Sequence, residues 1–255
     1  MRLQISCWII LRKGQLLMLK ADSDPSNPGL IVHEIRKYLQ FVSTLGCGGF
    51  DCSAQAVEMM QEWGSGRRFH IETIDQIEKM AGDCCCCHLS TGRRKIVFGS
   101  GDPKAKLMFI GDYPDTEDGE QGLPFVGKAG DLLTKIIYAM GFTRENVYLC
   151  NVIKCSLPGM REPAQEEITA CLSLLHRQIQ AVQPDIICTL GQVSAQAVLN
   201  TAAPLAALRG RFHPYNNRIK VMPTYHPSLL LADETRKRDV WEDMKLVMKE
   251  YSKKS

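Results

Sequence analysis

Short apolar segments alternate with longer amphipathic segments from about residue 95 onward, and this alternation restricts the chain to one class of fold. The apolar segments are AKLMFIG (105–111), NVYLCNVIKC (146–155), DIICTLG (185–191) and RIKVMPTYHP (218–227). Short, nearly continuous apolar runs are typical of strands that are buried on both faces. We therefore predict an α/β fold in which a four-stranded parallel sheet is covered by helices on both sides.

The segments between and after these runs have the periodicity of helices. In residues 126–141 the apolar side chains fall on one side, and the segment ends at a glycine. Residues 163–182 begin with a proline in the first turn, and residues 236–251 are amphipathic. Each segment is expected to be a helix.

Residues 1–80 have a different pattern and are predicted to be a mostly helical, partly irregular extension to a domain at 81–255. SDPSNPG (23–29) has turn chemistry, whereas 31–46 and 72–82 have helical spacing. No apolar run reaches the roughly 18 residues that a membrane-spanning helix needs, and the N-terminal run lacks the charge order of a signal peptide. A cytoplasmic protein is expected. The net charge of +3 allows a polyanionic partner without requiring one.

Polar residues stand where the predicted strands end. They are Asp112 and Asp115 after the first strand, Asn151 after the second, and His226 after the fourth. Ligands bind at the carboxyl ends of parallel strands, so these side chains are expected around one crevice. The amide of Asn151 suits the edge of a pyrimidine, and Phe125 on a glycine-rich loop suits stacking on a flat ligand.

Each of these residues also has a structural interpretation. Asn151 is compatible with a turn, His226 with a buried structural histidine, and the two aspartates with helix capping. The loop at 111–130 is rich in glycine, but it lacks GxxxxGK[ST] and GxGxxG, and its carboxylates would repel a phosphate. A nucleotide phosphate is therefore not the expected ligand.

Eleven cysteines are many for a chain without a secretory signal, and the odd number argues against a disulfide framework. Cys84 and Cys87 form a CxxC pair within CCCC, and Cys155 and Cys171 follow far downstream. Four thiolates suit a structural zinc ion or a [4Fe–4S] cluster, and their spacing does not choose between them. Core cysteines without a ligand are the third alternative.

Seven motifs in unbroken order resemble the family 4 uracil-DNA glycosylases, which are the iron–sulfur members of the uracil-DNA glycosylase superfamily. The motifs are GDYPD, GLPFVGKAG, NVIKC, ACLSLL, LGQVSAQAV, LRG and TYHPSLLL, and the likeness covers about residues 84–250. The resemblance implies a three-layer α/β/α sandwich and a [4Fe–4S] cluster. It also implies a DNA repair enzyme that flips uracil out of DNA and hydrolyses its glycosidic bond, which leaves an abasic site.

The resemblance assigns the cluster ligands to Cys84, Cys87, Cys155 and Cys171. The family reads CxxCxL with an arginine a few residues later, and only Cys87-His88-Leu89 followed by Arg93 or Arg94 fits that register. The cluster would be structural or would orient DNA, because hydrolysis of a glycosidic bond requires no electron.

The active-site residues of the family carry over in the same way. Phe125 would stack on the flipped uracil, Asn151 would bind its edge, and His226 would stabilise negative charge on uracil O2. Asp112, with Asp115 as the alternative, would position the attacking water. The remaining residues of the substrate-binding loop would be Gly111, Tyr113 and Pro114.

DNA contacts are expected on two kinds of residue. A leucine of the loop at 226–233, Leu229 or Leu230, would be wedged into the space that the flipped base leaves. Lys128, Lys154 and Arg161 would contact phosphates. The expected partner is uracil-containing DNA, single- or double-stranded, and the expected state is a monomer.

The first motif departs from the family pattern, which is GEAPG. Asp112 is one methylene shorter than glutamate, Tyr113 replaces a small residue, and Asp115 replaces a glycine. Asp115 also falls where the first family of the superfamily carries the tyrosine that excludes the methyl group of thymine. A protein that binds or traps uracil in DNA with weak or altered hydrolysis is therefore the alternative function, and tight binding without turnover would identify it. A cluster-based electron carrier is a third hypothesis.

Overall fold

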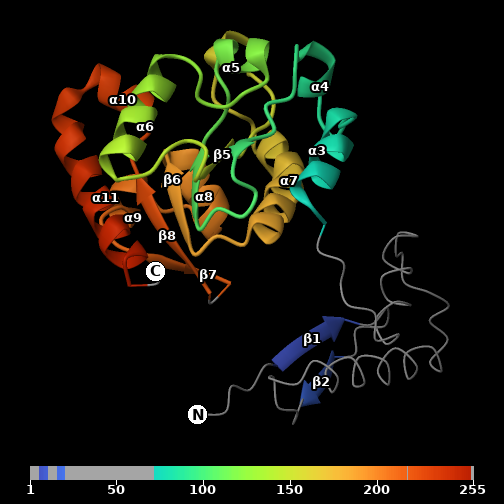
Figure 1. Cartoon of the computed structure of the whole chain (residues 1–255). Helices are drawn as coiled ribbons and strands as arrows, with labels where there is room; N and C mark the ends of the chain where they lie inside the picture. The colour runs from blue at the N-terminus through green and yellow to red at the C-terminus, as the bar shows by residue number, and fades with distance from the viewer. Residues whose placement is uncertain (1–5, 11–15, 21–71, 217, 254–255) are drawn as a thin grey trace. The chain divides into compact units, whose positions relative to one another are not determined.

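The computed structural model describes residues 6–10, 16–20, 72–216 and 218–253, and the chain divides into two units, Met1–His70 and Ile71–Ser255. In the first unit β1 (Ser6–Ile10) pairs antiparallel with β2 (Leu16–Lys20), with Ser6 opposite Lys20 (Figure 1). The sequence analysis predicted a mostly helical extension and missed this pair. The helix predicted at 31–46 lies outside the described residues.

The second unit is built on a six-stranded sheet in the order β3-β5-β4-β6-β8-β7. The four predicted strands form its parallel centre, and two short antiparallel strands extend it at the edges. The central strands are β5 (Tyr148–Asn151), β4 (Leu107–Gly111), β6 (Ile186–Leu190) and β8 (Ile219–Thr224). The edge strands, β3 (Ser100–Gly101) and β7 (His213–Tyr215), were missed because they span only two and three residues.

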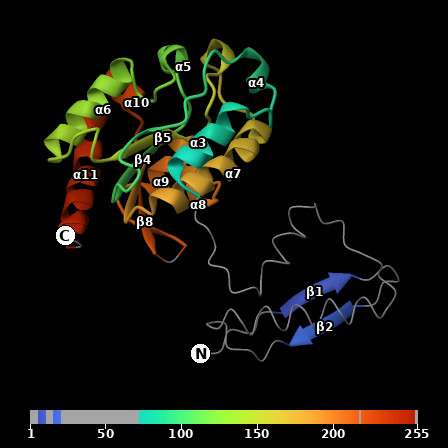
Figure 2. The same ribbon diagram turned by 45° about the vertical axis from the view of Figure 1, so that its right-hand side comes forward.

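Helices cover both faces of this sheet, so the predicted three-layer arrangement is confirmed (Figures 1 and 2). One face packs on α3 (Ile74–Gly82), α7 (Gln165–Val182) and α8 (Gln192–Leu199). The opposite face packs on α6 (Lys128–Ala139), α10 (Pro227–Ala232) and α11 (Lys237–Tyr251). The remaining short helices are α4 (Leu89–Gly92), α5 (Thr116–Gln121), α9 (Leu205–Leu208), and the 3-10 turns η1 (Pro158–Met160) and η2 (Glu234–Arg236).

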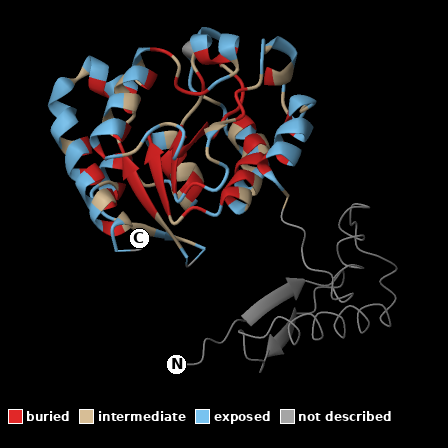
Figure 3. Ribbon diagram, viewed as in Figure 1, coloured by how far each residue is buried: buried red, intermediate tan, exposed pale blue. Residues whose placement is uncertain are grey.

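The central strands are buried throughout because their side chains alternate between the two helical layers. Met108 and Ile110 of β4 belong to the core on the α7 side, whereas Leu107 and Phe109 belong to the core on the α6 side. Figure 3 shows the sheet as the buried centre of the domain. This double burial explains why the strands read as continuous apolar runs.

Helix α3 belongs to this domain rather than to the extension. Thr73 caps it with a capping box to Gln76, and Ile77 is fully buried in the core beside α7. The boundary between the two units therefore falls at residues 70 and 71, ten residues before the predicted one. Over the described residues, we find no helix with the length and apolar character needed to cross a membrane.

Candidate active site

The carboxyl ends of the central strands meet at one edge of the sheet. Gly111 stands opposite both Asn151 and Leu190, and Leu190 stands opposite Thr224. A cavity of about 160 Å³ lies beside these ends. A cavity of roughly this size admits benzene in another protein, so a single pyrimidine ring fits. The residues that line it are Asp112, Tyr113, Asp115, Asp118, Phe125, Ala129, Gly130, His226 and Ser228.

Asn151 is not one of the lining residues, and its buried amide is unsatisfied. It is 1% exposed, and neither Nδ2 nor Oδ1 has a hydrogen-bond partner among the described residues. A Cβ at Gly111 would lie 2.3 Å from Asn151 Oδ1 and 2.6 Å from Phe125 Cζ, so only glycine lets the amide and the ring converge there. Each unpaired buried polar group costs about 1–3 kcal/mol, and such a group in a native fold points to a missing partner.

Phe125 has a strained backbone at the cavity. Its φ of 57° lies in the left-handed region, which costs a residue with a side chain about 1–3 kcal/mol. Gly130 makes this conformation possible, because a Cβ there would lie 1.8 Å from Phe125 O. The Phe125 ring is buried, with its centroid 6.0 Å from the His226 ring and the two planes 30° apart. Strain of this kind is characteristic of functional sites.

His226 follows β8 and caps α10. Its Nδ1 accepts the Ser228 N–H at 3.2 Å and lies 2.7 Å from Ser228 Oγ. Burial lowers the pKa of the imidazole to about 4 and outweighs the opposing effect of Asp115, so the ring is neutral at pH 7. We assign the proton of the neutral ring to Nε2, because Nδ1 is an acceptor. His226 is therefore a hydrogen-bond donor without charge.

Asp112 directly follows β4, and its carboxylate lies at the N-terminus of α8. Oδ1 accepts the Ser194 N–H at 2.7 Å. Gly191 has a φ of +117°, and a Cβ there would lie 2.2 Å from Asp112 Oδ2, so only glycine at this position leaves room for the carboxylate. Burial raises the pKa of Asp112 to about 6, although the Ser194 and Val193 donors oppose the rise. At pH 7 most Asp112 is ionised, with a basicity suited to accepting a proton.

Asp115 has a structural task at the same cavity. Its Oδ1 accepts the Asp118 N–H at 2.8 Å, and Asp118 Oδ2 accepts the Asp115 N–H at 3.3 Å, which together form a capping box at the start of α5. Asp118, which the sequence analysis did not single out, also accepts the Val126 N–H at 2.8 Å. In the sequence, the D-x-x-D spacing of Asp115 and Asp118 before Gly119 could have indicated this capping pair.

Tyr113 and Pro114 occupy the loop between these aspartates. The Tyr113 ring lines the cavity and also packs on the apolar cluster that contains Leu89, Cys155 and Cys171. Burial raises the pKa of its hydroxyl, with the Asp112 charge adding to the rise. Pro114 is buried. The ring that replaces a small residue in GDYPD thus connects the cavity to the cysteines.

Two of the predicted DNA contacts are wrong, because their side chains are buried. Lys154 is 1% exposed, and its ammonium donates to Asn151 O at 2.6 Å and to Gln178 Oε1 at 2.5 Å. Leu230 is also 1% exposed. Leu229 is 41% exposed, and Leu231, which the prediction omitted, is 48% exposed.

The other two predicted phosphate contacts lie on the surface. Lys128 is exposed in the first turn of α6. Arg161 is exposed, but both terminal nitrogens donate to the buried carboxylate of Glu167, at 2.5 and 2.9 Å. Lys128 is therefore the freer of the two cations to meet a phosphate.

The four predicted cluster ligands line a second cavity, of about 210 Å³, together with Cys86. Arg93 encloses it by donating to Cys84 O at 2.7 Å and by placing Nη1 3.9 Å from Cys155 Sγ. Within the described part of the chain, no group of three or more histidine, cysteine or acidic side chains is arranged to hold a metal ion. Four thiols beside one cavity are the ligand type that both a zinc ion and a [4Fe–4S] cluster use.

The three-layer fold and the cavity at the strand ends are those of an α/β enzyme, and comparisons with known proteins identify its family. A sequence model of the Uracil DNA glycosylase superfamily matches residues 98–245, which is more than half of the chain. The chain therefore belongs to the uracil-DNA glycosylase superfamily and, by the relatives described next, to its type-4 family.

Three type-4 uracil-DNA glycosylases illustrate the similarity. The protein from Saccharolobus solfataricus is 36% identical over 192 residues, which cover 72% of this chain and 89% of the relative. Those from Sulfurisphaera tokodaii and Thermotoga maritima are each 35% identical, over 69% and 68% of this chain and 84% and 92% of the relatives. Nearly the full length of each relative is thus represented here.

Proposed function

We propose that this protein removes uracil from DNA by hydrolysing the bond between the base and deoxyribose, as the names of its type-4 relatives describe. The observation that carries the proposal is the unpaired amide of Asn151 beside the strained Phe125. One edge of uracil presents an adjacent carbonyl and N–H, which a single amide can satisfy together. A flipped uracil would thus give partners to both orphaned atoms of Asn151 and cover the ring of Phe125.

His226 would assist departure of the base. As the bond between C1′ and N1 breaks, its electron pair passes to uracil, and negative charge develops at N1 and O2. The neutral His226 donates Nε2–H to O2, and it needs no charge of its own to do so. Donation from a preorganised group in a partly dry site is worth about 3–4 kcal/mol.

Asp112 would orient the attacking water. The water oxygen bonds to C1′, and its proton passes to the Asp112 carboxylate, from which it returns to solvent or to the uracil anion. The pKa of about 6 makes Asp112 a better proton acceptor than an ordinary carboxylate. Asp115 is less suited to this step, since its carboxylate caps α5.

We further propose that Cys84, Cys87, Cys155 and Cys171 hold a [4Fe–4S] cluster. When bound, the cluster would supply a covalent crosslink between the segment before α4, the segment after β5 and α7. Cluster binding requires these thiols to lose their protons, although burial raises the pKa of Cys155 and that of Cys171, the latter to about 11. Iron per chain and the visible absorbance of the purified protein test this assignment.

The experiment for the main proposal is release of free uracil from an oligonucleotide that contains one uracil. Purified, cluster-loaded protein is expected to produce abasic sites in this strand and none in a matched strand with thymine. Asn151→Ala should lose at least about 10-fold in rate, because the edge of the base is no longer bound. Absence of release in every strand context would contradict the proposal.

One observation favours the alternative of uracil binding without turnover. Asp112 Oδ1 accepts the Ser194 N–H, and this hydrogen bond restrains the rotation of the Asp112 side chain toward the base. The side chain is also one methylene shorter than the glutamate of the family pattern. Tight, saturable binding of uracil-containing DNA without an abasic product would identify this second function. Action as a monomer in the cytoplasm belongs to the same proposal, and sedimentation with and without DNA tests the monomer.

A further inference from the structure

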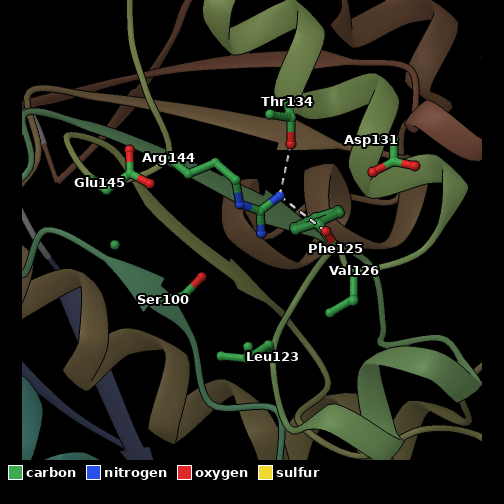
Figure 4. Close-up of a pocket in the computed structure, with 9 residues that line it drawn as sticks. Ser100, Leu123, Phe125, Val126, Asp131, Thr134, Arg144 and Glu145 are labelled. Carbon is green, nitrogen blue, oxygen red and sulfur yellow. Dashed lines mark hydrogen bonds between the residues drawn. The ribbon is translucent and has the colours of Figure 1, made fainter.

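The loop that carries Phe125 is held by a side chain that lies outside the candidate active site. Arg144, in the segment between α6 and β5, donates from Nη2 to Pro124 O at 2.8 Å and from Nη1 to Phe125 O at 3.0 Å. Nη1 also donates to Thr134 Oγ1 of α6 at 3.1 Å. Figure 4 shows the guanidinium reaching from its own loop toward Phe125 and Thr134.

These contacts fix the direction of the Phe125 ring. Two successive carbonyls accept from one planar guanidinium, so the peptide before Phe125 and the peptide after it are each held by one hydrogen bond. The orientations of these two peptides set the backbone angles of Phe125 and thus the direction of its side chain. Because Phe125 has a φ of 57°, the loop would relax toward an ordinary conformation if nothing held it.

A second contact holds the loop on the other side of Phe125. The buried Asp118 accepts the Val126 N–H at 2.8 Å. The Asp118 carboxylate thus binds the N–H of Val126, while the Arg144 guanidinium binds the carbonyls of Pro124 and Phe125. The two charges also favour each other, although burial lowers the pKa of Arg144. The guanidinium stays charged, since arginine does not deprotonate in proteins.

Arg144 does not line the candidate active site and contacts it through this loop. It lines a separate cavity of about 440 Å³, whereas the cavity of about 160 Å³ beside Asp112 and His226 does not include it. Phe125 lines both cavities. The route from Arg144 to a bound base therefore runs through Phe125.

We propose that Arg144 is a positioning residue that keeps Phe125 in the conformation that stacks on the flipped base. This inference rests on the proposed function, because it names how the uracil-binding surface is maintained. It assigns the arginine a task that is distinct from DNA binding and from the chemical step. Removal of the Arg144 guanidinium therefore weakens recognition of free uracil as well as of uracil in DNA.

The test compares Arg144→Met and Arg144→Lys with the wild type in three measurements: inhibition by free uracil, kcat and KM on a uracil-containing oligonucleotide, and Kd for undamaged DNA. Arg144→Met is expected to weaken uracil inhibition and to lower kcat/KM by about 10- to 100-fold, because a misplaced ring costs this much. Arg144→Lys should give values between those of the wild type and Arg144→Met, since lysine keeps the charge but lacks the planar fork that holds both carbonyls in one fixed geometry. The Kd for undamaged DNA should not change.

A matched control and a double mutant make the test decisive. Arg211 is exposed and donates to Ala207 O, so Arg211→Met should match the wild type in all three measurements. In a Phe125→Leu background, Arg144→Met should have little further effect on uracil inhibition, since the ring through which it acts is gone. Thermal unfolding identifies the folded fraction of each variant, and the affinities are measured on that fraction.

Two outcomes overturn the inference. One is a folded Arg144→Met with wild-type uracil inhibition and kcat/KM, and the other is an effect of Arg144→Met that is just as large in the Phe125→Leu background. Failure of the proposed function has a different signature, because the wild type itself would then release no uracil.

Discussion

Replacing Asp112 by asparagine is expected to stabilise the protein while it strongly lowers activity. Burial raises the pKa of Asp112 from an ordinary 3.8 to about 6, which is a cost of the ionised form in the folded state. At 1.36 kcal/mol per pKa unit, this cost reaches about 3 kcal/mol at pH 7. Asparagine keeps an oxygen that can accept the Ser194 N–H but carries no charge. Asp112→Asn should therefore gain up to about 3 kcal/mol, and should lose at least about 100-fold in uracil release.

The gain in stability of Asp112→Asn depends on pH in a direction that follows from the pKa of Asp112. Since the folded pKa is the higher one, folded Asp112 binds more protons than the unfolded chain between pH 3.8 and about 6. The stability that protonation gives the wild type is complete below this window and is lost as the pH rises through it. The advantage of Asp112→Asn should thus be full above pH 6, and should shrink to about half at pH 5.

Denaturant unfolding at pH 7 and pH 5 measures both parts of this prediction. Asp115→Ala is the matched control, because removal of the cap of α5 should destabilise the protein by about 1 kcal/mol at both pH values. The reasoning would be refuted if Asp112→Asn were less stable than the wild type at pH 7. An advantage of equal size at pH 7 and pH 5 would also refute it, since burial of the charge would then not be its cause.

Three further predictions test other parts of the site. The rate of uracil release at low substrate should rise about tenfold from pH 5 to pH 7 and then level, because Asp112 ionises near pH 6 while His226, with a pKa of about 4, stays neutral. Lys128→Gln should reduce the slope of log K for DNA against log salt by about 1, whereas the buried Lys154→Met should lower the Tm and leave that slope unchanged. Gly111→Ala should lose uracil inhibition, because its Cβ would meet Asn151 and Phe125, whereas Gly82→Ala, with nothing within 4 Å, should match the wild type.

The sequence was sufficient for the parts of the fold that depend on periodicity. Continuous apolar runs predicted the four central strands, and helical spacing predicted α6, α7 and α11 to within two residues of their observed ends. The edge strands β3 and β7 were missed because strands of two or three residues have no period to detect. The β1 and β2 pair was missed because its two apolar runs were read only as a possible signal or membrane segment.

For the candidate site, sequence reasoning found the residue types but not the directions of their side chains. Strand order predicted that Asp112, Asn151 and His226 would gather, because parallel strands end at one edge. Lys154 was misassigned because a lysine near a strand end is exposed in most proteins, and only its three-dimensional contacts show the buried partners. Arg144 gave no signal at all, since its role depends on two backbone carbonyls about twenty residues earlier in the chain.

Three unfavourable features lie together at the ends of the central strands, and the proposed base and water would offset part of their cost. Asn151 has a buried amide without partners, Phe125 has a strained backbone, and Asp112 has a desolvated charge. Each costs stability, and the closely packed cores on both faces of the sheet offset that cost. In the proposed complex, uracil would give the Asn151 amide its partners and the Phe125 ring a stacking surface, and an ordered water would solvate Asp112. Binding of the base and the water would thus offset part of this cost, and both must be bound before hydrolysis can begin.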